Sequence, residues 1–310
     1  MNQRPGRELR NLLRQGRPLP FIGVYDVFSA SIAARYFKGI FVSGFSFAAS
    51  HYGLPDIGFI AWSDILGFVQ RLRAVLPDNY LLVDLDDGYA DVELARHVAA
   101  HLEHAGAAGI VLEDQRRPRK CGHLEGKRLL DLDEYLEKLD SVLAGRRDLM
   151  VVARTDASEP EEVFRRARSF ADAGADAVLV DAVGNIEMVA ELRRALDCPL
   201  AINQIGGGKT PLWNIEELEE AGASIVLYST PCLFAAQRAV ERTLDGLRAE
   251  QGLAKAQRDS ATLAECHRLL RENLEWRHVS TESAVEAVQA TAREERLPAQ
   301  ARYCADEVEE

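Results

Sequence analysis

The sequence predicts a closed (β/α)8 TIM barrel followed by a C-terminal helical extension. Eight short apolar runs recur along the chain, and each is continuous rather than alternating, which is typical of parallel strands buried on both faces. The runs span residues 21–26, 39–45, 80–86, 108–114, 149–157, 177–183, 199–205 and 224–230. Eight β–α units in about 250 residues fit a closed barrel. An open doubly wound sheet is the alternative, but no GxGxxG follows the first run to support a dinucleotide-binding version.

Helical stretches with recognisable ends lie between the runs. The stretch 63–76 begins at Ser63, a favourable N-cap, and the stretch 159–176 carries a proline and acidic residues in its first turn. After about residue 250 the strand pattern stops, and residues 255–297 look helical and charged. We therefore expect a catalytic barrel over residues 1–250 and a helical extension over residues 251–310.

Composition excludes several classes of function. The net charge of −12 argues against an overall basic surface for nucleic acid or anionic lipid. The five cysteines form no CxxC pair, which argues against a zinc knuckle and suits a reducing compartment. The N-terminus lacks the apolar core of a signal peptide, and no apolar run is long enough to span a bilayer. We expect a cytoplasmic protein with neither nucleic-acid nor membrane partners.

Polar residues gather at the predicted carboxyl ends of the strands, where barrel enzymes place their active sites. They are Tyr25, Asp26, Ser43, Asp84, Asp86, Asp87, Glu113, Asp114, Arg154, Thr155, Asp156, Asp181, Asn203, Tyr228 and Ser229. Any one of them could cap the following helix, but capping does not account for all of them. So many carboxylates on one rim repel each other unless a metal cation or an arginine offsets them.

Three of these carboxylates suggest a metal site. Asp84, Asp86 and Glu113 come from adjacent strands and offer hard oxygen ligands, which suit Mg²⁺ or Mn²⁺. Zinc is less expected, because no histidine stands beside the two aspartates. Arg154, on the opposite side, is expected to bind a substrate carboxylate through its planar fork.

The segment LEDQRRPRKCGHLEGK, residues 112–127, follows the fourth strand. Gly122 and Gly126 permit movement, so the sequence predicts a lid that closes over a substrate. A thiol at Cys121, flanked by basic residues and His123, is expected to have a lowered pKa. The alternative is a solvated basic loop with an incidental cysteine.

Several motifs together carry a resemblance to a known family. They are SG (43–44), YGLPD (52–56), DLDDGY (84–89), EDQ…P…KCGH (113–123), ARTDA (153–157) and N…GGKTP (203–211). In these motifs the sequence resembles the isocitrate lyase/phosphoenolpyruvate mutase superfamily. The resemblance implies a Mg²⁺-dependent barrel enzyme that acts on a small 2-oxo or 2-hydroxy carboxylate. It also implies homo-oligomers, tetramers or dimers, in which a C-terminal helix is exchanged between subunits.

The resemblance also implies roles for individual residues. In the lyases of the superfamily the cysteine of the KCGH motif, here Cys121, is the catalytic acid–base. We expect Arg154 and Glu113 to act with it, and Asp84, Asp86 and Glu113 to hold the metal. The expected substrate-binding residues are Ser43, Gly44, Phe45, Gly122, His123, Asp181 and Asn203. The implied reaction is retro-aldol cleavage of a small 2-hydroxy di- or tricarboxylate into a 2-oxo acid and a carboxylate.

Three positions depart from the family pattern and keep alternatives open. Phe45 stands where lyases often have a second glycine, Asp181 stands in place of a glutamate, and Gly206 stands where many members have a glutamate. These changes indicate a divergent substrate. Cys121 favours carbon–carbon cleavage without excluding carbon–phosphorus chemistry, because a similar loop occurs in one mutase. The alternatives are a mutase or hydrolase of carbon–phosphorus bonds, an oxaloacetate decarboxylase, or a non-catalytic barrel used as a binding or scaffold subunit.

Overall fold

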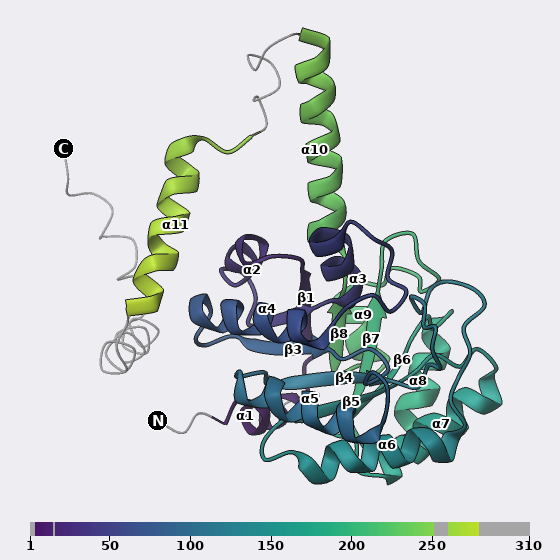
Figure 1. The fold of residues 1–310 in the computed structure, drawn as a ribbon. Coiled ribbons are helices and arrows are strands. Elements are labelled where there is room, and N and C mark those ends of the chain that lie inside the picture. Colours follow the sequence, from purple (N-terminus) through teal and green to yellow (C-terminus); the bar gives the residue numbers. More distant parts are fainter. Residues whose placement is uncertain (1–3, 15, 251–259, 279–310) are drawn as a thin grey trace, which may run out of the picture. The chain divides into compact units, whose positions relative to one another are not determined.

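Eight parallel strands close into a barrel in chain order in the computed structural model, which describes residues 4–14, 16–250 and 260–278 (Figure 1). The strands are β1 (Leu19–Val24), β2 (Gly39–Val42), β3 (Tyr80–Asp84), β4 (Gly109–Glu113), β5 (Met150–Thr155), β6 (Ala177–Val180), β7 (Leu200–Gln204) and β8 (Ile225–Tyr228). Each predicted apolar run overlaps one strand, so the predicted fold class is confirmed. Pairing of β1 with β8, with Ile22 opposite Tyr228, closes the sheet and rules out the open alternative.

The helices alternate with the strands. They are α1 (Pro5–Leu13), α2 (Val27–Ala33), α3 (Gly44–Phe47), α4 (Trp62–Val75), α5 (Val92–His104), α6 (Leu132–Gly145), α7 (Pro160–Asp172), α8 (Ile186–Ala195), α9 (Ile215–Glu220), α10 (Pro231–Glu250) and α11 (Leu263–His278), with a π-helical turn at Ala48–Tyr52. The predicted N-cap at Ser63 is wrong: α4 begins at Trp62, and Ala61 occupies the cap position. Asp91 does cap α5, since its Oδ1 accepts a hydrogen bond from the Leu94 amide at 2.8 Å.

Among the described residues, two helices, α10 and α11, follow β8. Residues 4–261 form one compact unit, and α11 belongs to a second. α11 lies within the stretch predicted to be helical, whereas residues 251–259 and 279–310 lie outside the described residues. Helix exchange between subunits stays a prediction. Among the helices that the structure describes, none has both the length and the apolar character that a bilayer crossing requires.

The barrel core begins at its amino-terminal end with α1. Leu9 and Leu13 of this helix are buried in one cluster with Phe21, Leu82 and Met150 from three strands. The helix is also hydrogen-bonded to Asp148, two residues before β5. Asp148 accepts hydrogen bonds from the amides of Gly6 at 2.8 Å and Arg7 at 3.0 Å, which satisfies two otherwise unpaired donors of the first turn.

Gly6 is a point where the packing of α1 can be tested. A Cβ atom at Gly6 would lie 1.9 Å from the carbonyl oxygen of Asp148, so Gly6→Ala requires the helix to shift. We expect Gly6→Ala to lower the free energy of unfolding by about 1–3 kcal/mol, measured by urea denaturation. Gly184→Ala is the matched control, because nothing lies within 4 Å of a Cβ there. Equal stability of the two variants would show that α1 does not pack as described.

Candidate functional site

The carboxyl ends of the strands surround a small cavity. Most of the predicted site residues border it: Ser43, Phe45, Asp84, Cys121, Gly122, Arg154, Asp181 and Asn203. The space inside is only about 20 Å³, which is room for about one water molecule. A substrate therefore binds only after the residues around the cavity move apart.

Asp84 and Asp86 form one side of the site. Asp84 Oδ2 accepts a hydrogen bond from the Gly44 amide at 3.2 Å, and Asp84 Oδ1 accepts one from the Asp86 amide, also at 3.2 Å. A Cβ atom on Gly44 would lie 3.0 Å from both Asp84 Oδ2 and Asp86 Oδ1, so these two oxygens converge on one point. Buried Asp86 Oδ1 makes no hydrogen bond with the described residues. Arg119 Nη1 lies 3.3 Å from the same oxygen as an ion pair. Two converging carboxylate oxygens, one of them without a hydrogen bond, fit a Mg²⁺ ion whose other ligands are water or substrate.

Burial raises the pKa of Asp84 and of Asp86, which are close enough to repel each other. A divalent cation between them would restore their ionised forms. The Gly44 amide, expected to contact substrate, donates to Asp84 instead.

Glu113 lies in the same cluster but is bound by arginines. It has no exposed surface, and its Oε1 is 2.5 Å from Arg119 Nε, while its Oε2 is 3.4 Å from Arg154 Nη2. Among the residues that the structure describes, no three His, Cys, Asp or Glu side chains are arranged as a preformed metal site. The side chains best placed to hold Mg²⁺ are therefore Asp84 and Asp86 rather than the expected set of three.

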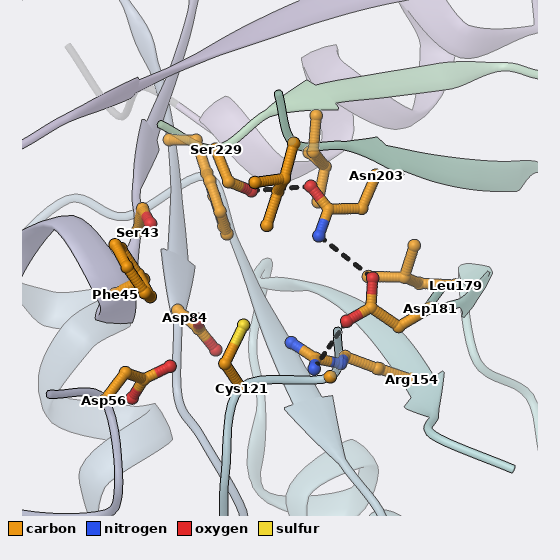
Figure 2. Close-up of a pocket in the computed structure, with 14 residues that line it drawn as sticks. Ser43, Phe45, Asp56, Asp84, Cys121, Arg154, Leu179, Asp181, Asn203 and Ser229 are labelled. Carbon is orange, nitrogen blue, oxygen red and sulfur yellow. Dashed lines mark hydrogen bonds and ion pairs between the residues drawn. The ribbon is translucent and has the colours of Figure 1, made fainter. Parts of the chain in front are cut away.

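Arg154 is the centre of an ionic network on the opposite side. Its Nε and Nη2 bind the two oxygens of Asp156 at 2.9 and 3.0 Å, and Nη2 also lies 2.7 Å from Asp181 Oδ2. Asn203 Nδ2 donates to Asp181 Oδ1 at 2.9 Å, and Ser229 Oγ donates to Asn203 Oδ1 at 2.6 Å (Figure 2). Side chains from β5 and from the ends of β6, β7 and β8 are thus joined. The guanidinium of Arg154 is expected to bind a substrate carboxylate, but its edge formed by Nε and Nη2 already binds Asp156.

Asp181 is ionised in this network. Burial alone would raise the pKa of Asp181, but Arg154, His123 and Asn203 together lower it well below its usual range. The shorter side chain at this position thus serves as a fixed negative partner for Arg154.

The Cys121 thiol faces the cavity between Asp84 and Arg154 (Figure 2). Burial raises the pKa of Cys121 to about 11, although the backbone amide of His123 and the charge of Arg154 act in the opposite direction. The expected lowering of this pKa is wrong, because the neighbouring basic groups point elsewhere. Lys120 Nζ, for example, lies 3.3 Å from the carbonyl oxygen of Glu125. At neutral pH the thiol is protonated and is therefore a proton donor.

The segment after Cys121 closes over the ionic network. A Cβ atom at Gly122 would lie 1.9 Å from Asp181 Oδ2 and 2.4 Å from Asp156 Oδ1, so only glycine fits there. His123 Nε2 lies 3.5 Å from Asp181 Oδ1, and its Nδ1 accepts a hydrogen bond from the Lys209 amide at 2.9 Å. Gly206 has open space around its Cβ position, where many family members carry a glutamate.

Two residues of the site were missed from the sequence. Asp56 lines the cavity, and its carboxylate binds Arg119. Arg119 was counted only as one of several basic loop residues. The signal for Asp56 was its place in the YGLPD motif, whereas nothing in the basic run distinguished Arg119 from its neighbours.

Ser43 Oγ accepts a hydrogen bond from the Ser46 amide at 3.3 Å and caps α3.

Phe45 forms part of the cavity wall. Its ring meets that of Phe234, from α10, edge to face with centroids 6.0 Å apart. An aromatic pair of this geometry holds the ring in place. The replacement of glycine by phenylalanine therefore reduces the cavity on this side.

Comparisons with known proteins find similar sequences and similar structures. The sequence model of the phosphoenolpyruvate phosphomutase family matches residues 9–248. A 2-methylisocitrate lyase of Aeropyrum pernix is 34% identical over 246 residues, which cover 78% of this chain and 79% of the relative. A structure of oxaloacetate acetylhydrolase superposes with a TM-score of 0.82 at 30% identity, covering 88% of this chain and 95% of the other. A structure of 2,3-dimethylmalate lyase superposes with a TM-score of 0.83 at 26% identity, covering 89% and 95%.

The resemblance predicted from the motifs is therefore confirmed. The family match covers most of the chain, and the relatives align along most of their own length. The chain belongs to the phosphoenolpyruvate phosphomutase family, within the isocitrate lyase/phosphoenolpyruvate mutase superfamily, and is an enzyme of its carbon–carbon lyase branch.

Proposed function

We propose that the enzyme is Mg²⁺-dependent and cleaves a small 2-hydroxy di- or tricarboxylate into a 2-oxo acid and a carboxylate. The observation that carries this proposal is the position of the Cys121 thiol, at a cavity between the Asp84–Asp86 pair and the Arg154 network. Burial there raises the pKa of Cys121 to about 11, which favours a proton donor. A retro-aldol cleavage needs a proton donor at the carbon that leaves, and a cation at the carboxylate that stays. The site offers a position for each.

The residues of this chain would divide the reaction as follows. Asp84 and Asp86 would hold Mg²⁺, which when bound polarises the oxygens of the 2-hydroxy acid. Arg154, already fixed by Asp156 and Asp181, offsets negative charge that develops as the carbon–carbon bond breaks. As the carbon–carbon bond breaks, the substrate hydroxyl gives up its proton to water, and Cys121 donates its own proton to the carbon of the departing carboxylate enolate. The products are a 2-oxo acid and a carboxylate, and the Cys121 thiolate regains a proton from water. Ser43 and Asn203 border the same cavity and orient the substrate.

A second candidate is hydrolytic cleavage of oxaloacetate. Its support is the similarity to oxaloacetate acetylhydrolase, together with the Phe45 ring in the cavity wall, which favours a small substrate. Release of 2-oxo acid from 2-methylisocitrate, 2,3-dimethylmalate or phosphonopyruvate, and of oxalate from oxaloacetate, would separate the candidates. Homo-oligomers, either tetramers or dimers, and a cytoplasmic location remain further proposals.

Cys121 is tested by substitution. We expect Cys121→Ser to lower kcat by about 10²–10⁴-fold, because a hydroxyl is a far weaker acid than a thiol. Mg²⁺ binding, measured by calorimetry, should stay unchanged. Cys198→Ser is the matched control, since Cys198 is absent from the cavity lining. Full turnover in Cys121→Ser would exclude the proposed acid.

The metal position makes a separate prediction. Asp84→Asn should abolish the calorimetric signal of Mg²⁺ binding, and Gly44→Ala should weaken binding because its methyl group meets both converging oxygens. Glu113→Gln should bind Mg²⁺ nearly as well as the wild type, because Glu113 is held by arginines. A loss of Mg²⁺ affinity in Glu113→Gln as large as that in Asp84→Asn would contradict this assignment.

Phe45 is expected to limit the size of the substrate. Phe45→Gly removes the ring from the cavity wall, so kcat/KM should rise for the bulkier members of the substrate panel relative to the smallest. Loss of the ring should change the ratio of kcat/KM between the bulky and the small substrates by roughly 10-fold. An unchanged ratio, with normal thermal stability, would show that Phe45 does not set the size.

A further inference from the structure

Arg119 is a fully buried arginine on a loop whose neighbouring Arg117 is exposed. Its guanidinium meets carboxylates from three segments of the chain. Nη1 binds Asp56, from the loop that precedes α4, and lies 3.3 Å from Oδ1 of Asp86. Nε and Nη2 bind the two oxygens of Glu113 in β4 at 2.5 and 3.3 Å. One cation of the 115–130 loop therefore joins three otherwise separate carboxylates.

This arrangement is costly to break. A guanidinium removed from water has a large desolvation penalty, which only close, hydrogen-bonded carboxylates offset. Without Arg119, the carboxylates of Asp56 and Glu113 would stay buried beside those of Asp84 and Asp86 with no cation to offset their mutual repulsion. Opening the loop separates all of these charges at once. The ion pairs therefore favour the closed position of the loop.

The anchor at Arg119 extends along the backbone to Cys121. Lys120 lies between Arg119 and Cys121, and both its backbone amide and its backbone carbonyl are hydrogen-bonded to the side chain of Gln115. The Lys120 amide donates to Gln115 Oε1 at 2.9 Å, and Gln115 Nε2 donates to the Lys120 carbonyl at 2.7 Å. On the other side, Gly122 packs against the carboxylates bound to Arg154. Cys121 thus lies between two fixed points.

We propose that Arg119 is a positioning residue, whose ion pairs with Asp56 and Glu113 hold the 115–130 loop closed and thereby place the Cys121 thiol at the cavity. It touches neither the substrate position nor the thiol, because its guanidinium points into the carboxylate cluster. The inference rests on the proposed function only where it concerns turnover. Closure of the loop can be measured without a substrate.

The test compares Arg119→Gln and Arg119→Lys in the full chain. The first measurement is the rate at which iodoacetamide alkylates Cys121, followed by mass spectrometry of its peptide at pH 8. We expect Arg119→Gln to raise this rate 10-fold or more, because an open loop exposes the thiol and brings its pKa back toward the ordinary value. Arg119→Lys keeps the charge and should restore part of the protection.

Kinetics supply the second measurement. A misplaced acid should lower kcat by about 10²-fold in Arg119→Gln, while KM stays close to the wild-type value. Arg119→Lys should recover part of kcat. If the wild type cleaves no member of the panel, the proposed function fails, and the alkylation rates still decide the role of Arg119.

Arg116→Gln is the matched control. It removes the same charge from the same loop, but Arg116 pairs with Glu134 at 2.6 Å on the surface of the protein. Its alkylation rate should equal that of the wild type. Wild-type alkylation in Arg119→Gln would overturn the proposal. If Arg119→Gln fails to fold, Asp56→Asn removes one partner and keeps the Glu113 pair, and unchanged alkylation of Cys121 in that variant would overturn it equally.

Discussion

The structure of the site depends on one constraint, an excess of buried carboxylates at the rim of the barrel. The acids involved are Asp56, Asp84, Asp86, Glu113, Asp156 and Asp181, all buried. Two buried arginines lie among them, Arg119 beside Asp56 and Glu113, and Arg154 beside Asp156 and Asp181. Ionised carboxylates in such surroundings persist only with close cations and full hydrogen bonding. Arg119 and Arg154 supply the cations, and hydrogen bonds such as that from the Gly44 amide to Asp84 supply further stabilisation.

This charge balance explains why certain positions carry no side chain. Gly122 lies directly on the carboxylates bound to Arg154, and Gly44 lies beside the converging oxygens of Asp84 and Asp86. A methyl group at either place would push into the ionic groups. It also explains why Glu113 is less available to a metal than the two aspartates, since both of its oxygens already lie against arginines. Within the cluster, the position between Asp84 and Asp86 is the one where the carboxylates would stabilise a further cation most.

The same constraint determines the protonation state of Cys121, the proposed acid. A thiol near several arginines and lysines would usually be expected to lose its proton easily. Here the arginines are already paired with carboxylates, so their charge is largely cancelled at the sulfur, and burial becomes the largest influence on the pKa of Cys121. A protonated thiol suits an acid that delivers a proton to carbon, and it does not suit a nucleophile. The lysine and arginine residues of the loop therefore contribute to its shape more than to the reactivity of the sulfur.

The sequence by itself determined the barrel and the residues at its rim. Continuous apolar runs report burial on both faces, which is a local property, and chain order then brings the strand ends together. Asp84, Arg154 and Asn203 were predicted in this way, and Cys121 was predicted from the loop after the fourth strand and its KCGH motif. The structure brings all four to one cavity. The exact start of α4 was missed, because a serine near a helix start is a preference and not a requirement.

Only the tertiary structure decided which charges pair. Arg119 and Asp56 are 63 positions apart in the chain, and no local pattern relates them. Whether an arginine of the loop faces solvent, substrate or carboxylate depends on the position of segments distant in sequence. The pKa of Cys121 depends on that same placement, because desolvation and pairing act through space over a few ångströms. Residue types at strand ends can be predicted from the sequence, whereas their ionisation and partners follow from the packed fold.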